Sequence, residues 1–179
     1  MNAPEDMRLV RQCIRDFALR LDGLTVLTEA ATGYYAYTSV LCALAGAKKV
    51  YALARHSRYG TIDEVKDAVC AFGDLAALAR CAIEVVTEKT PEIIAEADII
   101  TNSGNVRPID RDMIGHMKGT AVIPLMYESW EFREEDVDLP ACRDKGILVM
   151  GTDESVKEIA MFQYSGPLCL KLIHLTGLL

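Results

Sequence analysis

Apolar residues along this chain fall into two patterns: short continuous runs, and longer segments in which they recur every three or four positions. The continuous runs are typical of parallel strands buried on both faces, and the periodic segments are typical of helices. The predicted strands lie at residues 24–27, 50–54, 83–86, 98–101, 121–123 and 147–149. Because helical segments separate them, the sequence predicts an α/β fold: a three-layer doubly wound parallel sheet, with an extra helix at each end and the strand order 3-2-1-4-5-6.

The segment 24–55 predicts the first β-α-β unit of this sheet. Its first apolar run enters a small-residue turn, Ala30–Gly33, and the apolar helix that follows ends near Gly46, before the second apolar run. Neither run alternates between apolar and polar residues, as expected for parallel strands covered on both faces. The helix is long enough for the right-handed crossover that joins such strands.

Capping residues mark the starts of several helices. Thr61 has Glu64 three residues on, a capping-box pattern that predicts a helix over residues 62–71. Thr90–Pro91 places a cap and a first-turn proline before a small helix, and another helix is predicted over 110–117. A further helical piece is predicted at residues 74–80.

Each end of the chain carries a predicted helix. The N-terminal segment is amphipathic and ends at Gly23, whereas the C-terminal helix is predicted over 154–176 with a break at Gly166–Pro167. Residues 168–175 are apolar on nearly every side, so this helix is predicted to pack on the domain or on a partner. The predicted division is an N-terminal helix over 1–23, a nucleotide-binding domain over 24–151 and a C-terminal helical segment over 152–179.

The composition narrows the function classes. A net charge of -7 and a pI near 5.0 argue against a nucleic-acid or anionic-membrane surface, which needs a local excess of lysine and arginine. The six cysteines include no C-x-x-C pair, so reduced thiols in a cytoplasmic protein are expected. No apolar stretch approaches the roughly 20 residues of a membrane span. No Ser-His-Asp set or metal cluster has usable spacing, so no metal is expected.

Ligands of an open parallel sheet bind beyond the carboxyl ends of the strands where the strand order reverses, here at the turns after the first and fourth strands. The first turn lacks the dinucleotide fingerprint G-x-G-x-x-G, because its glycine positions hold Ala30, Thr32 and Tyr35. Backbone N–H groups at a helix N-terminus still suit an anion, so the turn either holds the phosphates of a cofactor or only connects strand to helix. The candidate phosphate-binding residues are Ala30, Ala31, Thr32, Gly33 and Tyr34.

Two further turns complete the candidate cofactor site. The acidic residue expected to hold an adenosine ribose after the second strand is missing, and Arg55, His56 and Ser57 stand there instead. An arginine beside a serine suits a 2′-phosphate, which favours NADP over NAD; the alternative is a solvated loop. After the fourth strand, polar side chains are placed to bond a ribose or a nicotinamide amide, although they are also ordinary turn residues. They belong to the turn Asn102, Ser103, Gly104 and Asn105.

The second half of the chain resembles a known family. Residues 97–101 (A-D-I-I-T) and the segment 109–123, with M-K-G-T-A before the next strand, are similar to the nucleotide-binding domain of the D-2-hydroxyacid dehydrogenases and S-adenosylhomocysteine hydrolases. The resemblance covers roughly 24–151. It implies a Rossmann-like domain that binds NADP or NAD in an oxidoreductase-like protein, incomplete as an enzyme on its own. The catalytic arginine of the dehydrogenases would fall near Glu128, where none stands, so catalytic residues are unknown and enzyme activity stays open.

Two other functions stay open. Residues 26–35 (V-L-T-E-A-A-T-G-Y-Y) resemble motif I of the S-adenosylmethionine-dependent methyltransferases, in which an acidic residue, here Glu29, and a glycine turn, here Gly33, surround the methionine part. That family also implies an acidic residue after the second strand, which Ala54–Arg55 does not supply. The third possibility is a non-catalytic Rossmann module. It would act as a homo-oligomer through its terminal helices, or would contact a neighbouring domain through the last one.

Overall fold

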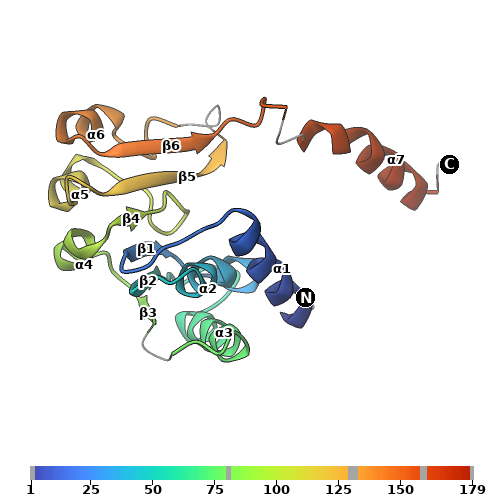
Figure 1. The fold of residues 1–179 in the computed structure, drawn as a ribbon, viewed down its shortest axis with the longest axis horizontal. Coiled ribbons are helices and arrows are strands. Elements are labelled where there is room, and N and C mark those ends of the chain that lie inside the picture. The colour runs from blue at the N-terminus through green and yellow to red at the C-terminus, as the bar shows by residue number, and fades with distance from the viewer. Residues whose placement is uncertain (1–2, 80–81, 129–132, 158–160, 178–179) are drawn as a thin grey trace.

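The computed structural model describes residues 3–79, 82–128, 133–157 and 161–177. Its sheet has six strands in the order β3-β2-β1-β4-β5-β6, and all the strand pairs are parallel (Figure 1). The strands are β1 (Thr25–Glu29), β2 (Lys49–Leu53), β3 (Ile83–Val86), β4 (Ile99–Ile100), β5 (Val122–Glu128) and β6 (Leu148–Thr152). The predicted fold class and strand order are therefore confirmed.

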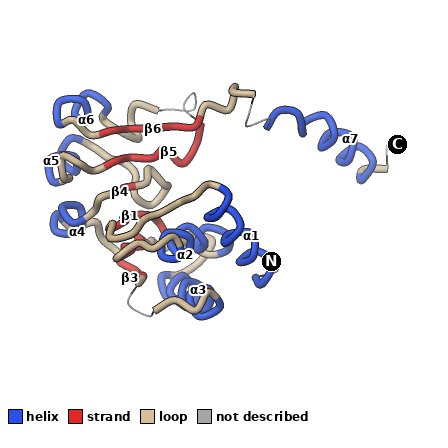
Figure 2. The backbone as a smooth tube through the Cα atoms, viewed as in Figure 1, coloured by secondary structure: helices blue, strands red, loops and turns tan. Residues whose placement is uncertain are grey.

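Helices follow the strands in alternation, as the tube in Figure 2 shows. The α-helices are α1 (Ala3–Asp16), α2 (Tyr37–Leu44), α3 (Ile62–Leu75), α4 (Pro91–Glu96), α5 (Arg111–His116), α6 (Leu139–Lys145) and α7 (Ser165–Leu175). Two 3-10 helices are η1 (Gly33–Ala36) and η3 (Met161–Tyr164). The predicted capping box at Thr61 is present, and the side chains of Thr90 and Asp110 cap α4 and α5.

The helices cover the two faces of the sheet in separate groups. Tyr51 and Leu53 of β2 belong to the apolar cluster that includes residues of α4, α5 and α6, whereas Ala52 packs in the cluster formed with α1, α2 and α3. Successive strand residues point to opposite faces, so this alternation places the sheet between two helical layers. The predicted three-layer arrangement follows directly from the apolar runs.

Two helix ends differ from the prediction. The first helix ends at Asp16 rather than at Gly23, because Ala18 adopts a left-handed backbone with φ 47° and the chain then turns toward β1. The helix from Ile62 continues to Leu75 without a separate piece over 74–80, and Ala77 (φ 57°) follows its end. Residue 80 lies outside the part of the chain that the structure describes.

One helix, α6, was not predicted. The Asp138 side chain accepts a hydrogen bond from the backbone N–H of Ala141 at 2.8 Å, and Gly146 follows the last residue with φ 76°. Both are ordinary helix-end signals that the sequence carries.

The C-terminal helix is shorter than predicted. Residues 153–157 form a turn in which Ser155 bonds to Asp153, and α7 begins only at Ser165. Gly166–Pro167 therefore lies in the first turn of α7, where proline costs no hydrogen bond, and is not a break. Figure 1 shows α7 beyond the end of β6 and apart from the sheet, and its leucines are exposed. Its packing on the domain or a partner stays a prediction.

Candidate functional site

The carboxyl ends of β1, β2 and β4 meet at one edge of the sheet. Glu29 of β1 lies opposite Leu53 of β2, and Leu27 lies opposite Ile100 of β4. The three predicted segments 30–34, 55–57 and 102–105 follow these strands directly and so begin at the same edge. Figure 1 shows that edge on the side toward which the strand arrows point.

The turn after β1 is more irregular than a direct strand-to-helix turn. Ala30 is buried and donates its N–H to the carbonyl oxygen of Leu53 at 3.0 Å. Gly33 has φ 70°, a conformation that disfavours other residues, and opens η1 before α2 begins. Tyr34 and Tyr35 are exposed on η1, so the position expected to hold a third glycine presents an aromatic ring to solvent.

The loop after β2 lies against the turn after β1. The Thr32 hydroxyl donates to the carbonyl oxygen of Tyr59 at 3.0 Å, and a Cβ on Gly60 would lie 2.6 Å from the Thr32 methyl carbon. Arg55, His56 and Ser57 are exposed in this loop. The turn after β1 thus contacts the loop after β2 just beyond the predicted segment 55–57, and the predicted ribose-binding side chains are accessible.

A second cation lies beside this loop. The Lys89 ammonium donates to the carbonyl oxygens of Val106 and Pro108 at 2.8 and 2.5 Å. Burial lowers the pKa of Lys89; the charge of Asp110 opposes this shift and the charge of Arg55 adds to it. Sequence reasoning missed Lys89, whose only signal was its place a few residues after the third strand.

The turn after β4 is tied to the neighbouring strands. Asn102 is buried and its side-chain oxygen accepts from the N–H of Met126 at 2.6 Å, while its side-chain nitrogen has no partner among the described residues. The Thr101 hydroxyl donates to the Thr28 hydroxyl at 2.8 Å and lies 3.0 Å from that of Ser103. Asn102 and Ser103 are thus structural groups beneath the surface.

The exposed part of this turn begins at Gly104. Asn105 donates its side-chain amide to the carbonyl oxygens of Ala30 and Leu53, each at 3.1 Å, and its backbone N–H to the Glu29 carboxylate at 3.0 Å. Asn105 therefore connects the ends of β1 and β2 to the loop after β4. Next to it, Arg107 pairs with Asp136 at 2.8 Å.

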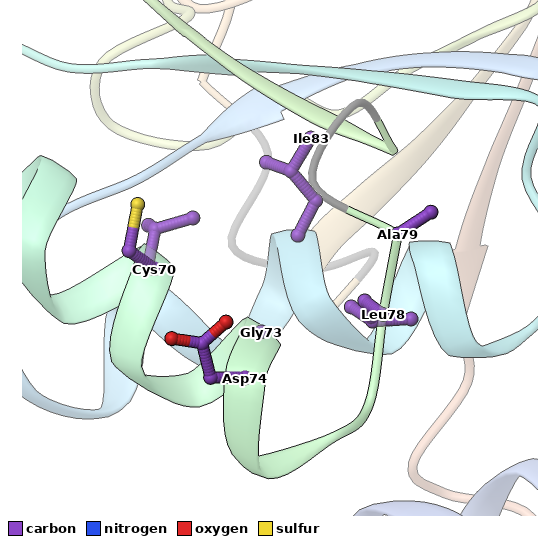
Figure 3. A pocket seen from close by; sticks show the side chains of 7 residues that line it. Cys70, Gly73, Asp74, Leu78, Ala79 and Ile83 are labelled. Atoms are coloured by element: carbon purple, nitrogen blue, oxygen red, sulfur yellow. The ribbon is translucent and has the colours of Figure 1, made fainter.

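A cavity of about 300 Å³ lies elsewhere, between the end of α3 and the start of β3 (Figure 3). No residue of the three predicted segments lines it. Its lining residues are Val69, Cys70, Gly73, Asp74, Leu78, Ala79 and Ile83. This end of β3 is opposite to the carboxyl edge, so the cavity is separate from the candidate site. Within the described ranges, no group of three or more His, Cys, Asp or Glu side chains could hold a metal ion, and no helix is long and apolar enough to cross a membrane.

No protein-family model matches the sequence, and no curated protein matches it. Solved structures do. Shikimate 5-dehydrogenase from Listeria monocytogenes, in complex with shikimate and NAD, is 12% identical with a TM-score of 0.54, over 81% of this chain and 51% of that one. Quinate dehydrogenase from Corynebacterium glutamicum, in complex with NAD, is 14% identical with a TM-score of 0.52, over 79% and 48%. The chain has a Rossmann-type fold. It spans about half the length of these two dehydrogenases.

Proposed function

We propose that this chain is an NAD(P)-binding Rossmann domain of a dehydrogenase-like protein and is incomplete as an enzyme on its own. The observation that carries the proposal is the convergence of three turns at the carboxyl edge of the sheet, where Asn105 bonds to the ends of β1 and β2 and Thr32 bonds to the loop after β2. The two similar dehydrogenases hold NAD in their structures and extend well beyond the region that this chain matches. A further domain would therefore supply the substrate site.

The turns at the carboxyl edge of the sheet would each contact a different part of a dinucleotide. Arg55 with Ser57 suits an adenosine 2′-phosphate, because a guanidinium binds phosphate oxygens in a bidentate manner, and Lys89 adds positive charge. The turn Ala30–Tyr34 would hold the diphosphate with backbone N–H groups, and Gly104–Asn105 would lie toward the nicotinamide. The bound cofactor would supply a hydride. This chain binds and orients it, and we assign no catalytic residue.

Titration of the full chain with NADP and NAD tests this function. A ligand that binds only the native state raises its thermal stability, so both should stabilise the protein and NADP should do so more. Arg55→Gln should weaken NADP roughly tenfold, the worth of one charge-assisted bond, and NAD little. Arg8→Gln is the matched control, because Arg8 lies on the exposed surface of α1 and pairs with Glu5. If neither nucleotide raises the thermal stability at millimolar concentration, the proposal is wrong.

S-adenosylmethionine belongs in the same titration as the ligand of the alternative function. Glu29 stands where the methyltransferase resemblance places its acidic residue, but its carboxylate already accepts a bond from Asn105. The segment Arg55–Ser57 after β2 lacks the carboxylate that would accept bonds from the ribose hydroxyls in that family. Stabilisation by S-adenosylmethionine or S-adenosylhomocysteine without any effect of NADP would favour the methyltransferase-like domain.

A second function, self-association, is favoured by two exposed apolar surfaces. Met126, Leu148 and Met150 lie exposed on β5 and β6, and the leucines of α7 are exposed as well. Large exposed apolar surfaces mark interaction sites. We propose that α7 and this strand surface form a homo-oligomer, or contact a neighbouring domain.

Sedimentation velocity of the full chain distinguishes a homo-oligomer from contact with a neighbouring domain. We expect a dimer, and Leu172→Glu should shift it toward monomer, whereas Lys171→Gln on the same helix should leave it unchanged. A monomer at high concentration would contradict self-association and leave the neighbouring domain as the partner.

A further inference from the structure

The turn after β4 lies across the carboxyl end of β1. The Glu29 carboxylate accepts the backbone N–H of Asn105 at 3.0 Å, and the Asn105 side chain reaches the carbonyl oxygens of Ala30 and Leu53 at 3.1 Å. A Cβ on Gly104 would lie 3.4 Å from the same Glu29 oxygen, so the turn sits directly against this carboxylate. The last residue of β1 therefore holds a segment that comes from the far side of the strand-order reversal.

This contact crosses the path that a dinucleotide takes in a Rossmann-type fold. The adenosine lies toward β2, the nicotinamide lies toward β4, and the diphosphate passes over the turn after β1. Glu29 immediately precedes that turn and is only 9% exposed. The diphosphate of a dinucleotide bound in this way would lie next to the Glu29 carboxylate, and charges that are largely buried interact more strongly than charges in water.

We propose that Glu29 is the residue that keeps this site closed: its carboxylate holds Asn105 over the end of β1 and repels the diphosphate of an incoming dinucleotide. The inference rests on the proposed NAD(P)-binding function and adds a regulatory property to the same site. A ligand enters only when the turn at Asn105 moves away from Glu29. The free chain therefore binds dinucleotides weakly.

Two variants separate the charge of Glu29 from the contact of Asn105. Glu29→Gln keeps the size of the side chain and an oxygen that accepts the Asn105 N–H, so it removes the charge with little change in packing. Asn105→Ser removes the amide donors to Ala30 and Leu53 and leaves the charge in place. Glu84→Gln is the matched control, because Glu84 of β3 pairs with Lys49 at the opposite end of β2.

The test is calorimetric titration of the full-length variants with NADP, inorganic pyrophosphate and neutral adenosine. We expect Glu29→Gln to bind NADP and pyrophosphate roughly tenfold more tightly than the unchanged protein, with no gain for adenosine. Asn105→Ser should bind NADP at most about threefold more tightly, because it loses the bonds to Ala30 and Leu53 but keeps the Glu29 charge and the backbone bond to it. Glu84→Gln should match the unchanged protein.

The outcomes separate this inference from the proposed function. If the unchanged protein binds NADP and neither site variant binds it more tightly, the closed-site inference is wrong and the function stands. If only Glu29→Gln binds pyrophosphate and no protein binds NADP, the proposed function is wrong, and only the repulsion of a diphosphate by Glu29 stands. Absence of binding by every protein to every anionic probe would overturn both.

Discussion

Two strands of equal length in the same sheet, β1 and β6, have opposite surroundings. Every residue of β1 is buried, whereas Leu148, Met150 and Thr152 of β6 are exposed. β1 pairs with β2 and β4, and β6 pairs with β5 at the edge of the sheet. The difference shows that the polar contacts and the exposed apolar surface lie on different strands of the same sheet. The central strand ends in polar groups that its neighbours hold in place, and the edge strand carries apolar groups that remain available.

The polar groups at β1 are held by partners from distant parts of the sequence. Thr28 bonds to Thr101, Glu29 to Asn105, and the N–H of Thr25 to the Asp98 carboxylate at 2.9 Å. Buried polar groups are costly unless they are bonded, so these contacts fix how β4 and its turn lie on β1. A ligand at this end must compete with them, whereas a partner at β6 would only cover apolar surface.

The largest expected effect comes from a leucine in each strand. Leu27 of β1 is fully buried and Leu148 of β6 is 53% exposed. Leu27→Ala should lower the free energy of unfolding by about 3–4 kcal/mol, because it removes buried methyl groups and leaves a cavity. Leu148→Ala should cost less than about 1 kcal/mol. Urea unfolding of both variants measures the difference, and similar losses would show that β6 is covered as well as β1 is.

The next effect concerns the polar contact that holds the start of β1. Burial opposes ionisation of Asp98, but its bonds to Lys118 at 2.6 Å and to the N–H of Thr25 outweigh burial and hold the pKa of Asp98 below its ordinary value. A carboxylate with a depressed pKa stabilises the native state fully above the unfolded pKa of about 3.9, and that stabilisation is lost as the pH falls through the folded pKa.

Asp98→Asn should therefore cost about 1–2 kcal/mol at neutral pH. The difference in the free energy of unfolding between the variant and the unchanged protein should become smaller as the pH falls below about 4. Asp67→Asn, on the exposed surface of α3, is the control and should change little at either pH. A gap that stays constant with pH would mean that the Asp98 charge adds nothing to stability.

The same contrast explains what the sequence could predict. Parallel strands with two covered faces appear as continuous apolar runs, so β1 and β2 were predictable. The helix α6 has only seven residues, too few to show a clear apolar period, although Asp138 and Gly146 marked its ends. The pair Gly166–Pro167 predicts a break or kink because both residues disfavour helix interiors, whereas a position in the first turn of a helix tolerates them.

The candidate site was less predictable because its details depend on long-range contacts. The sequence identified which turns share the carboxyl edge, since strand order alone decides that. It could not show that Asn102 is buried, because that depends on Met126 in the next strand. The bonds of Asn105 to Ala30 and Leu53 join the turn after β4 to the ends of β1 and β2, and they too depend on how those strands lie together.

A smaller effect tests how crowded the carboxyl end of β1 is. A Cβ on Gly60 would meet the Thr32 methyl at 2.6 Å, so Gly60→Ala should cost about 1 kcal/mol and loosen the loop after β2 from the turn after β1. Gly73→Ala is the matched control, because a Cβ there has nothing within 4 Å and alanine favours a helix interior. It should stabilise by about 0.5–1 kcal/mol. Chemical denaturation measures the free energy of unfolding of both variants. If Gly60→Ala does not lower it, the close contact with Thr32 is contradicted.

The smallest expected effect on stability lies at β6. Met150 is 60% exposed, so Met150→Ser should change the free energy of unfolding by less than about 0.5 kcal/mol at protein concentrations at which sedimentation shows a monomer. Met113→Ser in the core is the control and should cost several-fold more, since Met113 is 3% exposed. If the proposed dimer forms, Met150→Ser should weaken it, because the strand surface of Met126, Leu148 and Met150 would lose one of its three large apolar side chains. A loss above about 2 kcal/mol in dilute solution would instead mean that a segment of the same chain covers β6.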